Sequence, residues 1–125
     1  MRKWSLLLTV LLAVLAACAP KGAYKNVTAD DLYAQLGRPG VMIVDVRTPS
    51  EYAQEHIAGA VNKPLQQIEV WYKTLPKDEP VYLYCHSGNR SHQAAEFLKG
   101  KGFRNIYNEQ GGIIAWNKRS YPLVR

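Results

Sequence analysis

Residues 81–91 read Val-Tyr-Leu-Tyr-Cys-His-Ser-Gly-Asn-Arg-Ser, and this stretch decides the architecture that we expect. Its first four residues form a continuous apolar run, which is typical of a strand covered on both faces. Small and polar residues follow at once, and a helical pattern begins near Ala94. A buried strand that leads through a short loop into a helix is typical of parallel sheets, in which ligands bind at the carboxyl ends of the strands. Cys85 stands at that position.

The loop after Cys85 contains residue types that suit an anion-holding turn. Gly88 and Asn89 tolerate a positive φ best, so successive backbone N–H groups can point inward as a nest. The helix that follows adds the positive end of its dipole, and both effects favour a thiolate at Cys85 over a thiol. Two plainer interpretations stand beside this one. Cys85 is a core residue that ends an apolar strand, or the turn is structural and Arg90 pairs with a carboxylate.

Strand-like and helix-like patterns alternate along the rest of the chain. Thr28 and Thr48 each suit the N-cap of a helix, and Pro49 and Glu51 complete a capping box after Thr48. The alternation predicts an α/β fold, a small parallel β-sheet flanked by helices on both faces. We expect strands at 41–44, 60–62, 81–84 and 105–107, and helices from 28 to 37, after Thr48, at 65–75, around 94–98 and around 113–116.

The first residues have the pattern of an export signal. A positive start at Arg2 and Lys3 precedes an apolar run over 4–17, which is shorter than the roughly 20 residues of a membrane-spanning helix. The run ends in Leu-Ala-Ala-Cys at 15–18, which resembles the bacterial lipobox, whose cysteine is diacylated and becomes the first residue of the mature chain. An ordinary signal peptide cut nearby is the alternative.

These features divide the chain into three parts. We predict a lipoprotein signal peptide over 1–17, a lipidated Cys18 with a polar tether over 18–26, and a folded domain over 27–123. Ala19, where an aspartate would favour the inner membrane, favours the outer membrane in organisms that follow that sorting rule. We therefore expect an exported protein, lipid-anchored in the bacterial envelope on the periplasmic side.

Charge and cysteine content restrict the function further. The net charge is +6, and removal of the two basic residues of the signal leaves +4. The basic residues are spread thinly, without a run or interleaved aromatic residues, so we expect no nucleic-acid binding. With Cys18 lipidated, Cys85 is the one remaining thiol in an oxidising compartment. Nothing in the sequence requires an oligomer, and we expect a monomer.

One group of residues comprises Asp45-Val46-Arg47, Glu51-Tyr52 and His56-Ile57-Ala58-Gly59-Ala60-Val61-Asn62. A second comprises Cys85-x-x-Gly88-x-Arg90-Ser91, Ala94-Ala95, Leu98, Gly102-Phe103, Asn105-Ile106-Tyr107, Gly111-Gly112 and Trp116. These two motifs resemble those of the rhodanese family, in the family's order, and the resemblance covers about 27–117. One departure is His86, where many members have arginine; because histidine is not a permanent cation, the substrate preference stays open.

The resemblance implies a sulfurtransferase of the thiosulfate type. It would move sulfane sulfur from thiosulfate or a similar anion to cyanide or a thiol, through a persulfide on Cys85, with no metal and no organic cofactor. The loop residues that would bind the substrate are His86, Ser87, Gly88, Asn89 and Arg90. Related phosphatases close this loop with seven residues instead of six, which would put their arginine at Ser91, so the spacing disfavours phosphate chemistry. A non-enzymatic rhodanese module that binds a partner or senses redox state is the alternative.

The roles of the remaining candidates follow from their places in the motifs. Asp45 and Arg47 are expected to support the loop, while Arg90 either places a charge near the bound anion or braces the loop. We assign Glu51 to its capping box alone, His56 to a structural role and His92 to the surface. A metal site at His86 is disfavoured, because adjacent residues such as Cys85 and His86 rarely present both side chains to one ion.

Overall fold

Five parallel strands form one sheet in the computed structural model of the chain, which describes residues 21–125. The order across the sheet is β1-β5-β4-β2-β3, and every neighbouring pair is parallel. The predicted parallel sheet is therefore confirmed, and β4 lies at its centre. The strands are β1 (Tyr24–Val27), β2 (Met42–Asp45), β3 (Val61–Asn62), β4 (Val81–Tyr84) and β5 (Ile106–Glu109).

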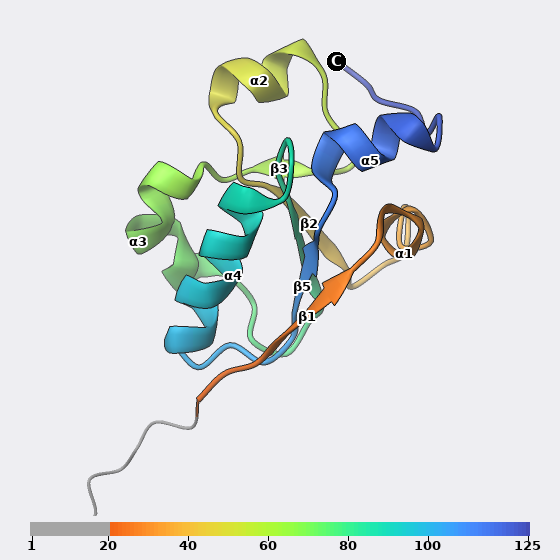
Figure 1. The fold of residues 1–125 in the computed structure, drawn as a ribbon. Helices are drawn as coiled ribbons and strands as arrows, with labels where there is room; N and C mark the ends of the chain where they lie inside the picture. The colour runs from red at the N-terminus through yellow and green to blue at the C-terminus, as the bar shows by residue number, and fades with distance from the viewer. Residues whose placement is uncertain (1–20) are drawn as a thin grey trace, which may run out of the picture.

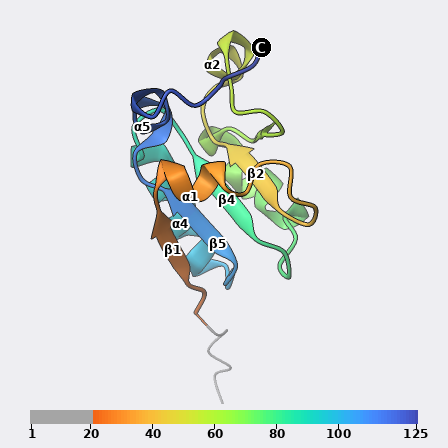
Figure 2. The same cartoon turned by 90° about the vertical axis from the view of Figure 1, so that its right-hand side faces the viewer.

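Helices cover both faces of this sheet, as predicted (Figure 1). Figure 2 shows α1 in front of the sheet and α4 behind it, with α2 beyond the carboxyl ends of the strands. The single helix expected at 65–75 is instead three short pieces, and the first break falls at Gln67, whose backbone leaves the helical region at φ −112° and ψ 16°. The helices are α1 (Ala29–Tyr33), α2 (Pro49–Gln54), η1 (Leu65–Gln67), α3 (Ile68–Trp71), η2 (Tyr72–Thr74), α4 (Asn89–Gly100) and α5 (Gly112–Lys118).

The central strand divides the core into two hydrophobic clusters, because successive side chains of a strand point to opposite faces. Leu83 packs in the cluster that also contains Leu98 of α4, and Tyr84 packs in the cluster that contains Trp116 of α5. All four are fully buried. Cys85 belongs to the first cluster, so the residue that begins the loop motif is anchored in packed core.

The helix starts at Thr28 and Thr48 follow the prediction. Each threonine hydroxyl accepts a hydrogen bond from the backbone N–H three residues later. In return, the backbone N–H of each threonine donates to a carboxylate, that of Asp31 in α1 and that of Glu51 in α2. Two complete capping boxes therefore begin α1 and α2. The first helix is shorter than expected, since it ends at Tyr33 and the chain continues as turns to Gly37.

The tether predicted over 18–26 is wrong at its carboxyl end, because Tyr24–Val27 forms the edge strand β1. It pairs in register with β5, and the Tyr24 hydroxyl donates a hydrogen bond to Glu96 of α4 at 2.6 Å. Before the strand, the N–H of Gly22 bonds to the carbonyl of Lys99 at 3.1 Å. The folded domain thus begins at least five residues earlier than the predicted position 27.

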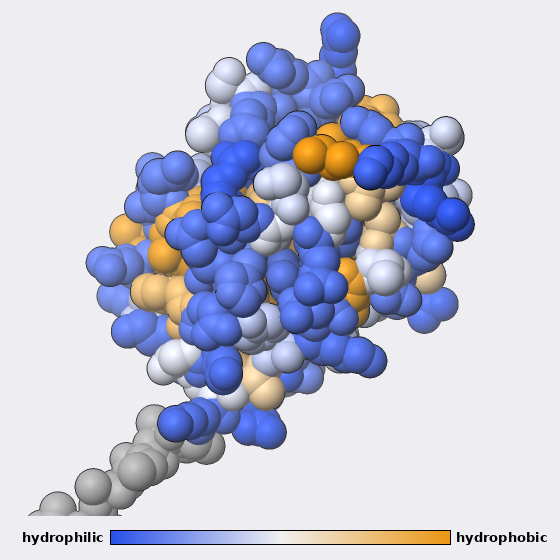
Figure 3. Space-filling model, in the orientation of Figure 1, coloured by the Kyte–Doolittle hydropathy of each residue, from blue (hydrophilic) through white to orange (hydrophobic). Residues whose placement is uncertain are grey.

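The surface seen in Figure 3 is mostly hydrophilic, with small separate hydrophobic areas. The most exposed large apolar side chain is Val70 of α3, at 74 %. Across residues 21–125, the helices are too short or too polar to cross a membrane. The predicted signal peptide and Cys18 lie outside the described residues.

Candidate active site

Cys85 lies directly after β4, and its side chain is almost fully buried. The backbone N–H of Gly88 donates a hydrogen bond to Cys85 Sγ at 3.0 Å, which closes the loop around the sulfur. Ser91 Oγ lies 3.6 Å from the same sulfur and donates to the carbonyl of Gly88 at 3.2 Å. The sulfur therefore sits inside a turn of backbone, with a donor already aimed at it.

The shape of this turn depends on Gly88. Its φ of +99° lies in the left-handed region, and it serves as the N-cap residue of α4. A Cβ at this position would collide with the backbone carbonyl of Gln110. Asn89, the other residue expected to favour a positive φ, is the first residue of α4 instead. The backbone reversal therefore falls on a single residue.

The start of α5 holds the loop from behind. The N–H groups of Ile113 and Ile114 donate to the carbonyls of Cys85 and His86 at 3.0 and 3.2 Å. Gly112, with φ +59°, touches the same two carbonyls so closely that a Cβ would overlap them. These bonds fix the two peptide units that carry the N–H groups of His86 and Ser87, the residues that lead from Cys85 to Gly88.

Asp45 and Arg47 form a buried ion pair next to the loop. Arg47 donates from Nε to both carboxylate oxygens at 3.0 Å and from a terminal nitrogen at 2.7 Å, and it also binds the carbonyl of Glu55. The side chain of Asn62 joins the carbonyls of Asp45 and Arg47. Because β2 pairs with β4, this network fixes the end of the strand beside Tyr84.

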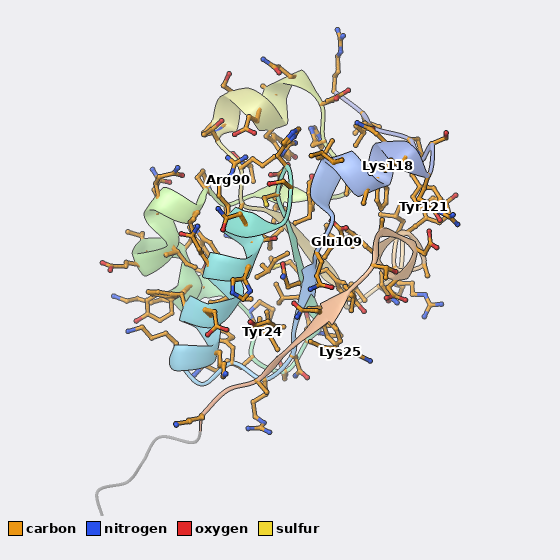
Figure 4. The ribbon with its side chains drawn as sticks, viewed as in Figure 1. Tyr24, Lys25, Arg90, Glu109, Lys118 and Tyr121 are labelled. Atoms are coloured by element: carbon orange, nitrogen blue, oxygen red, sulfur yellow. The ribbon has the colours of Figure 1, made fainter. Side chains whose placement is uncertain are left out.

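Arg90 forms a second ion pair, with Glu51 of α2. Its two terminal nitrogens donate to the two carboxylate oxygens at 2.6 and 2.9 Å, and Figure 4 shows Arg90 at the start of α4 on the side of α2. The hydrogen bonds from Arg90 and from Thr48 outweigh desolvation and lower the pKa of Glu51 to about 2. The assignment of Glu51 to its capping box alone is therefore wrong, because the same carboxylate also holds the loop arginine.

The side chains of His86, Ser87 and Asn89 are exposed at the rim of the loop. On the side of β5, a hollow of about 300 Å³ adjoins the loop. It is lined by Gly88, Asn89, His92, Asn108 and Gln110.

The two other histidines each contact a tyrosine. The ring of His56 stacks on Tyr52 with 3.7 Å between centroids, and its Nδ1 lies 2.8 Å from the Tyr52 carbonyl, as expected of a structural residue. His92 is exposed on α4, with Nδ1 3.3 Å from the Tyr24 hydroxyl. Over residues 21–125, no three histidine, cysteine or acidic side chains gather as metal ligands.

The structure adds one residue that the sequence did not single out, Glu109. Its side chain is fully buried. It lies where β5 leads toward α5 (Figure 4). One carboxylate oxygen accepts from the N–H of Gly111 at 3.0 Å, and the other has no partner among the described residues. Burial raises the pKa of Glu109 to about 7, against hydrogen bonds from Gly111 and Gly112 that lower it. Glu109 ends the strand Ile-Tyr-Asn-Glu and precedes a glycine pair, and nothing in this sequence pattern indicates that its carboxyl is buried.

Comparisons with known proteins agree with this geometry. Residues 28–119 match the family described as the Rhodanese-like domain. A "Sulfurtransferase" of Allochromatium vinosum is 43% identical over 84 residues, which cover 67% of this chain and 78% of that protein. A "Thiosulfate sulfurtransferase GlpE" of Pseudomonas entomophila is 33% identical over 99 residues, 79% of this chain and 89% of that one. The crystal structure of a rhodanese-related protein from Thermoplasma volcanium is 36% identical, with a TM-score of 0.73 over 81% of this chain and 98% of that chain.

Replacement of Gly88 by alanine tests the close approach of the loop to Gln110. A residue with a Cβ costs roughly 1–2 kcal/mol in the left-handed region, and steric overlap adds about 1–3 kcal/mol. We expect Gly88→Ala to lower the free energy of unfolding by both amounts, measured by urea denaturation. Gly59→Ala is the matched control, since Gly59 also has a positive φ of +82°, but a Cβ added there would meet no atom within 4 Å. Equal losses in the two variants would contradict the role of the contact.

Glu109 makes the stability depend on pH. Its carboxyl has a higher pKa in the folded state than in the unfolded chain, so protonation favours folding. The stabilising contribution of the protonated carboxyl is fully present below about pH 4.5, which is the pKa in the unfolded chain. It is lost as the pH rises through about 7, which is the pKa in the folded protein. This shift in the pKa of Glu109 corresponds to a change of about 3 kcal/mol in the free energy of unfolding.

We expect the difference in free energy of unfolding between wild type and Glu109→Gln to change by that amount between pH 4.5 and 8. Urea denaturation at each pH measures it, and other titrating groups cancel in the difference. A difference that does not vary with pH would contradict the burial of an ionisable carboxyl.

Proposed function

Since the chain belongs to the Rhodanese-like domain family, we propose that it is a sulfurtransferase that carries sulfane sulfur as a persulfide on Cys85. One observation carries the proposal: the sulfur of Cys85 lies inside a loop whose Gly88 N–H already donates to it at 3.0 Å. A donor aimed at sulfur stabilises a negative charge there, whether the charge is on the thiolate or on the outer sulfur of a persulfide. The sulfurtransferases among its relatives support the same reaction.

The proposed reaction consists of two displacements. In the first, the Cys85 thiolate attacks the outer sulfur of thiosulfate or a similar sulfane donor, the donor S–S bond breaks, and sulfite or the corresponding thiolate leaves. In the second, cyanide or a thiol attacks the outer sulfur of the persulfide and regenerates the Cys85 thiolate. The attacking species in each step is an anion and the leaving groups are stable anions, so neither displacement itself requires a general base.

The surroundings of Cys85 give the other residues supporting roles. The N–H groups of the first residues of α4, Asn89 and Arg90, have no acceptor inside the helix, and they remain available to a bound sulfur. The Asp45–Arg47 pair holds the neighbouring strand end. Arg90 braces the loop against α2 through Glu51, which supports the second of its two expected roles.

The length of the loop favours sulfur over phosphate as the transferred group. The loop comprises six residues, from Cys85 to Arg90, and a seventh would be Ser91. Ser91 is buried and hydrogen-bonded back to Gly88, so the turn is already closed there. A small cradle of this kind suits one added sulfur atom better than a tetrahedral phosphoryl group.

The proposal includes a location. We propose that the chain is exported and anchored by lipid on Cys18, with the domain on the periplasmic side of the envelope and the outer membrane favoured. The apolar run over 4–17 and the small residues before Cys18 support it. Two or three acyl chains hold a protein firmly to a membrane, where a single chain binds only marginally.

Sulfur loading of Cys85 is the direct test of the activity. The chain beginning at Ala19 is incubated with thiosulfate or a thiol persulfide, and its intact mass is measured. We expect a gain of one sulfur atom that cyanide reverses with release of thiocyanate, and no gain in Cys85→Ser. A folded protein that takes sulfur from neither donor would favour the alternative, a rhodanese module that binds a partner or senses redox state.

Membrane association tests the location. The full chain, expressed in a Gram-negative bacterium, is expected in the membrane fraction and in the detergent phase of a phase separation. Cys18→Ser lacks the sulfur that accepts the acyl chain, so it is expected to lose the mass of the lipid and to leave the detergent phase. Cys85→Ser is the matched control and should partition like wild type. Identical partitioning of all three proteins would contradict lipidation of Cys18.

A further inference from the structure

Four charged side chains surround the loop of Cys85, and they form two closed pairs. Asp45 pairs with Arg47 at 2.7 Å, and Glu51 pairs with Arg90 at 2.6 Å. Each pair joins one guanidinium to one carboxylate, so the charge of the set sums to zero. Neither arginine that the structure brings to the loop is left with its charge uncompensated.

The pairing of Arg90 is strong enough to decide what the site can bind. Both terminal nitrogens engage both carboxylate oxygens, the two-fold geometry in which guanidinium and carboxylate bind best. Both side chains are about two-thirds buried, at 27 % and 32 % exposure. The N–H and the hydroxyl of Thr48 also donate to Glu51, at one of the two oxygens that Arg90 binds. An incoming oxyanion can use Arg90 only by competing with a carboxylate that is already fixed in the best position.

Arg90 is the last residue of the loop, and its guanidinium is held by the carboxylate of Glu51. The hydrogen bond with Glu51 is the main cause that raises its pKa, and the charges of Glu51, Cys85 and Asp45 raise it further. At the rim of the loop, position 86 holds an exposed histidine, which is not a permanent cation. The N–H of Gly88 is a neutral donor. The backbone N–H dipole of the loop thus stabilises charge on the sulfur. The head group of a donor molecule, by contrast, meets little net positive charge.

We propose that the preferred sulfur donor is a thiol persulfide or polysulfide with an uncharged head group next to the sulfane sulfur, and that Glu51, through Arg90, disfavours the dianion thiosulfate. This inference rests on the proposed function and names the donor class of the same site. Thiosulfate brings two negative charges toward a thiolate in a cluster of zero net charge. A persulfide R–S–SH carries fewer negative charges than thiosulfate and does not need to be bound by Arg90.

The transfer from a persulfide is balanced without a further reactant. The Cys85 thiolate attacks the outer sulfur of R–S–SH, a new S–S bond forms on Cys85, and the S–S bond of the donor breaks. The thiolate RS⁻ leaves with the electron pair, and the proton stays on the transferred sulfur. The reaction therefore exchanges one thiolate for another, and no net oxidation takes place.

The test compares two donors on the full chain, purified in mild detergent: thiosulfate, and the freshly prepared persulfide of 2-mercaptoethanol, whose head group is uncharged. The protein is alkylated and digested at timed points, and the fraction of the Cys85 peptide that carries an extra sulfur gives the rate. We expect wild type to load from the persulfide at least about tenfold faster at equal concentration, the scale of one uncompensated charge near a partly exposed site.

Glu51→Gln is the decisive variant, because glutamine keeps the capping box and removes only the charge. Arg90 then becomes free to bind an oxyanion, and the ratio of the thiosulfate rate to the persulfide rate should rise about tenfold. Asp31→Asn is the matched control. Asp31 occupies the same capping-box position at α1, so the variant makes the same change of net charge without an arginine partner. Its rate ratio should equal that of wild type.

A second variant keeps the proposal testable if Glu51→Gln does not fold. His86→Arg adds a permanent cation at the exposed rim, and it should raise the same ratio. Wild type that loads equally fast from both donors, or folded variants whose ratio does not rise, would overturn the donor preference and leave the sulfurtransferase activity standing. Folded wild type that loads from neither donor would overturn the proposed function itself.

Discussion

The contact between two backbone segments, the loop after β4 and the chain that enters α5, is the constraint on which the site depends. Two N–H groups of α5 hold the carbonyls of Cys85 and His86, and the carbonyl of Gln110 lies against Gly88. With both flanks of the loop fixed, the N–H of Gly88 remains directed at the sulfur. The approach is possible because Gly88 and Gly112 have no Cβ, so these two glycines are as much a part of the site as the cysteine.

Electrostatics adds a second constraint on top of this backbone frame. The two arginines next to the loop each have a carboxylate partner, one buried and one partly exposed. The buried pair serves the architecture, since it joins the end of β2 to Arg47, which also binds the carbonyl of Glu55 just after α2. The partly exposed pair joins α2 to α4 beside the loop. In the donor preference proposed above, this second pair sets the charge that an incoming donor meets, so the same type of interaction would serve the architecture at one place and donor selection at the other.

Much of the fold could be predicted because its signals are local. The apolar run at 81–84 and the threonine caps of α1 and α2 each depend on residues within a few positions of one another. Edge strand β1 was missed because only Val27 of its four residues is buried, so Tyr-Lys-Asn-Val has neither an apolar run nor a clear alternation. Its place in the sheet comes from β5, about 80 residues later.

The backbone arrangement of the candidate site could be predicted from the sequence, but the pairing and burial of its charged side chains could not. The motif around Cys85 indicated the loop, the strand end and the glycine that turns it. The pairing of Glu51 with Arg90 spans 39 positions and depends on how α2 docks over α4, which no spacing in the sequence expresses. The burial of Glu109 was not predicted for a similar reason, because tertiary packing decides whether a carboxyl is buried.

The direction of β1 sets how the molecule is presented to its surroundings. All five strands run the same way, so the chain enters at the end of the sheet opposite to Cys85, with Gly22 fixed beside Lys99 at the base (Figure 1). Any support that holds the protein by its N-terminus therefore faces the base of the domain. The loop of Cys85 lies at the far end of the sheet, with His86, Ser87 and Asn89 exposed at its rim, so a bulky partner that approaches this rim does not meet that support.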